Sequence, residues 1–195
     1  MARVHFKHSL SFAVFSIFVI FSVSKIAQAG KLFPALGDPV TLSLRKEKFS
    51  HFRVYCQSTS VDPNPTIVQV GGANLTQGSA TRFGDIAVFD DALTQGPELT
   101  SKLLGRAQGF YASAGIHELA ALTSANIVFT TGKYNGSTIA IMGRNPVFSQ
   151  VREMPIVGGT GLLRFARGYV EARTHRFTII PPQATFEYNL YVYHF

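Results

Sequence analysis

The sequence contains a single cysteine, Cys56, among 195 residues. A lone cysteine cannot form a disulfide within the chain, so we expect packing and hydrogen bonds alone to stabilise the fold. We predict that Cys56 is a small, buried apolar residue. The histidines fit no metal-ligand spacing with Cys56 or with one another, and we therefore expect no bound metal. The histidines considered are His51, His117, His175 and His194.

The sequence also lacks a nucleotide-binding fingerprint and any evident redox centre. The stretch Gly158–Gly161 superficially resembles a phosphate-binding loop, but no Lys-Ser/Thr pair follows it and no helical pattern begins there. We predict a tight turn at this stretch, and no cofactor. Basic residues are scattered along the chain rather than gathered on one face, which argues against nucleic-acid binding.

Long apolar runs are scarce as well. The run Leu10–Val23 stands out, and it is shorter than the roughly 20 residues that cross a bilayer. Arg3 and Lys7 precede it, and the small-x-small pattern Ala27–Ala29 follows. This arrangement is typical of a cleaved secretory signal peptide and predicts a protein without a membrane anchor.

The predicted signal peptide divides the chain into three parts. Residues 1–29 form the signal, residues 30–48 an extended arm rich in turn residues, and residues 49–195 one domain of ordinary size. Removal of the signal takes away Arg3, Lys7 and Lys25, which lowers the net charge from +7 to +4.

From Phe49 onward, runs rich in Val, Ile, Thr, Phe and Tyr alternate with clusters of Gly, Pro and Asn, as expected of strands and turns. In the last run, Leu190 and Val192 lie on one face and Tyr191 and Tyr193 on the other. Eight antiparallel strands with short connections close into an up-and-down β-barrel with a lumen, and a two-sheet sandwich is the alternative. The expected strands are 49–57, 66–71, 83–90, 103–112, 120–130, 137–142, 162–175 and 184–195.

Several short motifs occur in one order between Val88 and Gly168. The series resembles that of plant dirigent proteins, and the resemblance extends over about Phe49–Phe195. It implies an all-β, eight-stranded antiparallel barrel of the allene oxide cyclase type, and a homodimer or homotrimer. The motifs are Val88–Pro97, Gly105–Tyr111, Gly132–Ser137, Gly143–Pro146 and Arg152–Gly161, followed by Ala166–Gly168.

The resemblance implies stereochemical control of phenoxy-radical coupling, for example of coniferyl alcohol to optically active lignans. A separate laccase or peroxidase in the cell wall, or apoplast, would supply the radicals, which favours an auxiliary protein over an enzyme. Two alternatives stay open. One is a dehydratase that forms pterocarpans from isoflavanols through a quinone methide, and the other is a non-catalytic cell-wall-binding protein.

The resemblance assigns a substrate-binding role to Arg152, and it makes Tyr111 and Asn145 pocket candidates. A guanidinium presents several fixed donors to phenolic, methoxy or carbonyl oxygens. A structural pair between Arg152 and a carboxylate is the competing interpretation, and Glu153 is adjacent in sequence.

Two neighbouring aspartates, Asp90 and Asp91, invite a similar comparison. Within a strand they would face opposite sides and could not share a proton or a metal. We favour a strand end in which both carboxylates accept backbone hydrogen bonds before a turn over Leu93–Pro97. The resemblance nonetheless makes Asp91 a candidate for the cavity rim and for catalysis.

The end of the first expected strand departs from the family pattern of Tyr, an aromatic residue, His and Asp. Here Tyr55 is kept, and Cys56, Gln57 and Ser58 take the other places. Tyr55 and Ser58 are candidates for substrate binding. Because a serine hydroxyl is a far weaker proton donor than a carboxylic acid, another group would have to protonate a substrate oxygen, such as Asp91 or a tyrosine hydroxyl.

Two further features have open interpretations. The small residues of Gly105–Tyr111 share one strand face, where they leave space for a ligand, admit a neighbouring subunit or allow a sharp bend. Asn74 and Asn135 fit the N-glycosylation pattern, and Asn135-Gly136 also fits a hairpin turn with positive φ.

Overall fold

The computed structural model describes residues 46–61, 63–72 and 78–195. The predicted signal peptide, nearly all of the predicted arm and Asn74 lie outside the described residues. Within those ranges, no helix has the length and apolar character needed to cross a membrane.

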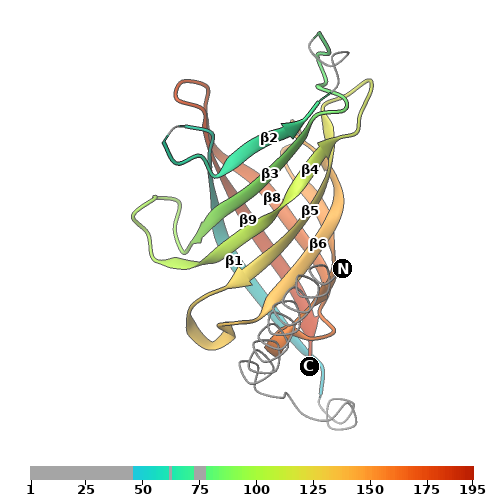
Figure 1. The fold of residues 1–195 in the computed structure, drawn as a ribbon. Coiled ribbons are helices and arrows are strands. Elements are labelled where there is room, and N and C mark those ends of the chain that lie inside the picture. The colour runs from blue at the N-terminus through green and yellow to red at the C-terminus, as the bar shows by residue number, and fades with distance from the viewer. Residues whose placement is uncertain (1–45, 62, 73–77) are drawn as a thin grey trace, which may run out of the picture. The chain divides into compact units, whose positions relative to one another are not determined.

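Strands make up almost all of the regular structure (Figure 1). Two 3-10 turns, η2 (Gly132–Tyr134) and η3 (Gly161–Leu163), lie in the β5–β6 and β7–β8 connections. The strands are β1 (Lys48–Thr59), β2 (Ile67–Gly71), β3 (Ile86–Thr94), β4 (Leu103–Ser113), β5 (Ala120–Phe129), β6 (Thr138–Pro146), β7 (Arg152–Gly159), β8 (Arg167–Thr178) and β9 (Gln183–His194).

Eight of these strands close into an antiparallel barrel, which confirms the predicted fold. Their order is β1-β9-β8-β7-β6-β5-β4-β3, and pairing of β1 with β3 closes the ring. Strand β2 pairs with β3 outside this ring. Full closure removes most exposed strand edges, as is usual in up-and-down barrels.

The membership of the ring differs from the prediction at one strand. The run 66–71, counted as a barrel strand, is the extra strand β2, and β7 takes its place although the sequence indicated a turn at Gly158–Gly161. Both Gly158 and Gly159 are extended and pair with β6. The turn lies further on, at Gly161, whose φ is +62°.

Strand β3 also extends beyond its expected end. It continues to Thr94, so Asp90 and Asp91 lie within the strand and the turn interpretation was wrong. As alternation requires, they face opposite sides. Asp90 is exposed and pairs with Arg106, while Asp91 is buried toward the barrel interior.

The barrel is filled at one end and hollow at the other. Ile127, Ile139, Leu190 and Val192 are completely buried and pack in the filled end. The alternation predicted for the last strand is thereby confirmed. Packing at this end anchors the strands, and the strand segments at the other end carry the cavity described below.

The small residues of β4 let neighbouring strands approach closely. A Cβ atom added at Gly105 would lie 1.9 Å from the backbone oxygen of Val128, and one at Gly109 would lie 2.1 Å from that of Ser124. These contacts require glycine because the backbones of β4 and β5 approach closely within the barrel wall.

The Asn135-Gly136 pair forms a turn between Tyr134 and Ser137, closed by a 2.9 Å bond from the Ser137 N–H to the Tyr134 oxygen. Of the two residues, only Gly136 has a positive φ, +79°, whereas Asn135 has φ −49° and ψ 130°. These angles are those of a type II turn.

Candidate functional site

The hollow end of the barrel contains a cavity of about 380 Å³. This volume falls within the range of roughly 300–1,000 Å³ that is common for small-molecule sites. Its walls combine aromatic and aliphatic side chains with a few polar groups. The lining residues include Ser58, Arg82, Asp85, Asp91, Tyr111, Thr123, Asn145, Arg152, Phe186 and Tyr188.

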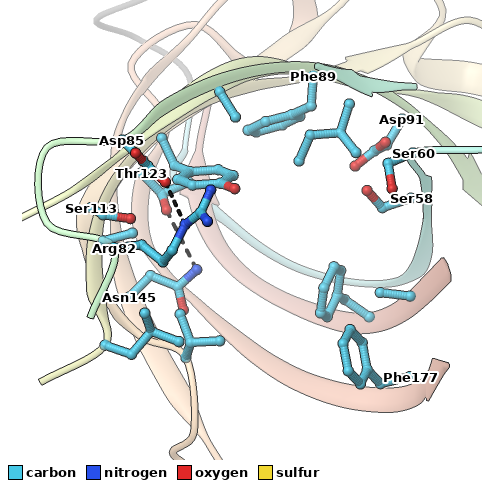
Figure 2. A pocket seen from close by; sticks show the side chains of 18 of the residues that line it. Ser58, Ser60, Arg82, Asp85, Phe89, Asp91, Ser113, Thr123, Asn145 and Phe177 are labelled. Carbon is cyan, nitrogen blue, oxygen red and sulfur yellow. Dashed lines mark hydrogen bonds and ion pairs between the residues drawn. The ribbon is translucent and has the colours of Figure 1, made fainter. Parts of the chain in front are cut away.

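Polar groups gather at two places in the cavity (Figure 2). Ser58, Ser60 and Asp91 lie together on one side, on β1, the loop that follows it, and β3. The other side carries Arg82, Asp85, Ser113, Thr123 and Asn145. A ligand with oxygen atoms at both ends of an apolar body would match this arrangement.

Asp91 is the carboxyl group of the first polar side. Its side chain accepts a hydrogen bond of 2.5 Å from the Thr66 hydroxyl and one of 3.4 Å from the Cys56 thiol. Burial raises the pKa of Asp91 to about 6, although hydrogen bonds from Thr66, Cys56 and Ser58 and the charge of Arg106 oppose the rise. A carboxyl group with this pKa can hold a proton near neutral pH and donate it to a bound molecule.

Arg152 supplies a buried positive charge at the start of β7. It is 3% exposed and donates to the Ala172 carbonyl and the Thr174 hydroxyl, at 3.4 and 3.1 Å. Its guanidinium lies 5.3 Å from the centre of the Phe186 ring. Burial lowers the pKa of Arg152, and the neighbouring Tyr188 opposes this.

No carboxylate among the described residues forms an ion pair with Arg152. Glu153, the partner considered from the sequence, is exposed on the other face of β7. A buried guanidinium is costly without a counter-charge, and its remaining donors suit an electron-rich oxygen in the cavity.

The second polar side combines an ion pair with an amide. Arg82 and Asp85 are paired at 2.5 Å. The Asn145 amide donates weakly to the Thr123 hydroxyl, at 3.4 Å, and its oxygen Oδ1 is buried without a hydrogen-bond partner among the residues that the structure describes. This side therefore offers hydrogen-bonding capacity that the protein itself leaves unused.

The structure brings five of the six predicted site residues to the cavity: Ser58, Asp91, Tyr111, Asn145 and Arg152. Tyr55 does not line it. The Tyr55 hydroxyl instead bonds Glu187 at 3.0 Å and accepts from Arg53 at 2.5 Å, because Tyr55 faces the opposite side of β1 from Cys56.

The cavity residues that sequence reasoning missed include Arg82, Asp85, Phe186 and Tyr188. The alternation of β9 placed Phe186 and Tyr188 on one face, and it would have indicated them once that face was known to be interior. Arg82 and Asp85 lie in the segment before β3, although Asp85 belongs to the run 83–90 that the sequence predicts as a strand. Among the described residues, no group of three or more His, Cys, Asp or Glu side chains is placed to hold a metal.

Comparison with known proteins identifies the family. The family described as Dirigent-like protein matches residues 49–193. The chain belongs to the dirigent family. It is 51% identical over 150 residues to dirigent protein 21 of Arabidopsis thaliana, covering 77% of this chain and 79% of that protein. It is 38% identical over 188 residues to pterocarpan synthase 1 of Glycine max, covering 96% and 98%.

A solved structure agrees with this assignment. The pterocarpan synthase dirigent protein GePTS1 matches with a TM-score of 0.72 at 39% identity, over 77% of this chain and 87% of that one. On β1, Ser58 stands at the position where the family pattern considered in the sequence analysis has an aspartate. The carboxyl group of Asp91 lies against it, on the adjacent strand β3.

Proposed function

We propose that this protein directs the stereochemistry of phenoxy-radical coupling, with monolignols such as coniferyl alcohol as substrates and radicals supplied by a separate laccase or peroxidase. The observation that carries the proposal is the buried Arg152 guanidinium, which lines an aromatic cavity without a carboxylate partner in the described part of the chain. It would hold a phenolic oxygen and thereby fix the rotation of a ring against Phe186.

Orientation is sufficient for this function. Two phenoxy radicals combine by forming one bond, so the protein need only favour one mutual geometry. A tenfold preference requires about 1.4 kcal/mol between the competing transition states. A few fixed hydrogen bonds in a confined site supply differences of that size.

Asp91 would act after coupling, as the acid that protonates the quinone methide oxygen. Its raised pKa keeps part of the population protonated near neutral pH. Asp91 would thereby supply the proton that the weakly acidic hydroxyl of Ser58 cannot donate.

A dehydratase is the second candidate, and Asp91 is also the observation that favours it. Loss of water from an isoflavanol requires a proton on the departing hydroxyl oxygen. The phenol that then closes the ring returns a proton. The similarity to the pterocarpan synthase of Glycine max, which extends over nearly the whole chain, supports this candidate.

Two assays separate the candidates. Purified protein is incubated with coniferyl alcohol and a one-electron oxidant, and the enantiomers of the products are resolved by chiral chromatography. The same protein is incubated with an isoflavanol without oxidant. Enantiomeric enrichment in the first assay supports the radical function, and pterocarpan formation in the second supports the dehydratase.

Matched variants test the role of the cavity. Arg152→Met should abolish enrichment, whereas Arg173→Met, which removes an exposed arginine of β8, should leave it unchanged. Racemic products and no turnover from the wild-type protein, together with binding to wall polysaccharide, would favour the non-catalytic cell-wall protein and refute our proposal.

A homo-oligomer is part of the proposal. Exposed apolar side chains form a row across the outside of β2, β3, β4 and β6, in which the small Ser124 of β5 separates the last two: Val68, Val88, Phe110 and Met142, each 42–50% exposed. A second copy of the chain would cover this row, because contiguous apolar patches on soluble proteins mark contacts. Light scattering of Phe110→Lys should show monomers where the wild type shows dimers or trimers; an unchanged mass would refute this interface.

Secretion and glycosylation complete the proposal, and they rest on the sequence of residues 1–29 and on Asn74 and Asn135. Asn135 is exposed in its turn. Protein recovered from the apoplast should begin near Gly30 and lose mass on treatment with an N-glycosidase.

A further inference from the structure

We infer that Thr66 and Cys56 are positioning residues that hold the Asp91 carboxyl group in the cavity wall and tune its proton donation. The inference deepens the proposed function, because it concerns the acid assigned there. Neither residue lines the cavity, so their contribution would pass through Asp91 alone.

Thr66 is held rigidly between two strands. Its N–H donates to the Thr59 oxygen at 2.7 Å, and its own oxygen accepts from the Asp90 N–H at 2.8 Å. Its hydroxyl accepts from the Thr59 N–H at 3.0 Å and donates to Asp91 Oδ1 at 2.5 Å. The Thr59 carbonyl oxygen is a second possible acceptor at 3.4 Å, but Asp91 Oδ1 is much nearer, so the hydroxyl hydrogen points mainly at the carboxyl group.

Cys56 binds the other oxygen. Its Sγ atom lies 3.4 Å from Asp91 Oδ2, and the residue is 1% exposed. Burial raises the pKa of the Cys56 thiol, and the Asp91 charge adds to this, so the thiol stays protonated and donates. Thr66 and Cys56 thus donate to different carboxyl oxygens, and Ser58 adds a third hydrogen bond from the cavity side. One of the four lone pairs is left for the transferable proton.

The charges around Asp91 are few. Tyr188 of β9 lies close enough for its pKa to be raised by Asp91, after burial as the main cause. Arg106 of β4 acts from the outer side of the sheet, where it pairs with Asp90. With few competing charges, the donors Thr66 and Cys56 are the adjustable elements. Both favour the ionised carboxylate and work against burial.

The test is a titration of Asp91 by carbon-detected NMR of the side-chain carboxyl group, in the full-length mature protein. Thr66→Val removes the hydroxyl and keeps the shape, while Thr66→Ser keeps the donor. We expect the midpoint of Asp91 to rise by about one pH unit in Thr66→Val and to stay in place in Thr66→Ser. Cys56→Ala should raise it by a smaller amount.

An unchanged Asp91 midpoint in both Thr66→Val and Cys56→Ala would overturn the inference. The Asp90 midpoint serves as the internal control for folding, since Asp90 faces outward. The product pH profile should move with the Asp91 midpoint. If the Asp91 midpoint shifts but the pH profile of the products does not, Thr66 and Cys56 do position Asp91, but Asp91 is not the acid. Failure of this inference can therefore be told apart from failure of the proposed function.

Discussion

The replacement Asp91→Asn should stabilise the protein at neutral pH while removing its proposed acid. Asp91 is 4% exposed, and its pKa is about 6 against an ordinary value of 3.8. Folding therefore favours the protonated form. The stability that this form contributes is complete below pH 3.8, and it is lost as the pH rises through 6.

The magnitude follows from the size of the shift. A difference of about two pKa units means that the free energy of unfolding is roughly 3 kcal/mol lower with Asp91 ionised than with Asp91 protonated. Asparagine resembles the protonated form in size and charge, and its oxygen can still accept from Thr66. We expect the free energy of unfolding of Asp91→Asn to exceed that of the wild type by about 3 kcal/mol at pH 7.5. At pH 4 the two proteins should have similar free energies of unfolding.

Urea unfolding of the mature protein at several pH values between 4 and 8 checks this expectation. The control is Asp90→Asn. Hydrogen bonds from Arg106 and Gln108 and the charge of Arg106 together outweigh burial and lower the pKa of Asp90. Its replacement should therefore reduce stability slightly at neutral pH, which is the opposite sign. A difference between Asp91→Asn and wild type that does not vary with pH would refute the reasoning.

Three further changes have definite expected outcomes. Gly109→Ala should destabilise the barrel by about 3 kcal/mol in thermal or urea unfolding, because the new Cβ meets the Ser124 backbone, whereas Gly158→Ala, with open space around it, should be tolerated. Tyr55→Phe should cost about 1 kcal/mol of unfolding free energy and leave product chirality unchanged, since Tyr55 lies outside the cavity. Asn145→Leu should keep or raise stability by up to about 1 kcal/mol, because it removes an unpaired buried oxygen, and should weaken substrate binding measured by calorimetry.

Alternation in the sequence predicted the parts of the fold in which each strand has one face inside the barrel. In β9 the pattern alone placed Leu190 and Val192 on one shared face, and the structure shows that this face is the interior one. The residue pair Asn135-Gly136 likewise predicted the turn between β5 and β6. Such features depend on local chemistry that a single strand or turn contains.

The missed features depend on neighbouring strands. Strand β7 carries Pro155 and two glycines, which locally favour a turn, but Met154 and Ile156 face the core and hold it in the sheet. Pro155 lies beyond the last pair between β6 and β7, which joins Ile141 to Ile156, and a proline is tolerated where such a ladder ends. The exclusion of Tyr55 from the cavity likewise depends on which face of β1 closes inward.

The seam between β1 and β3 places Ser58 of β1 next to Asp91 of β3. The register there pairs Cys56 with Leu93 and Gln57 with Ala92, so the next residues, Ser58 and Asp91, come side by side. An acid on either strand would therefore reach the same part of the cavity. Carboxyl groups on both would repel and share a proton, raising the pKa of one of them further. With Ser58 at this place, no second carboxylate of the described residues lies beside Asp91 across the seam, and the Ser58 hydroxyl is one of its hydrogen-bond donors.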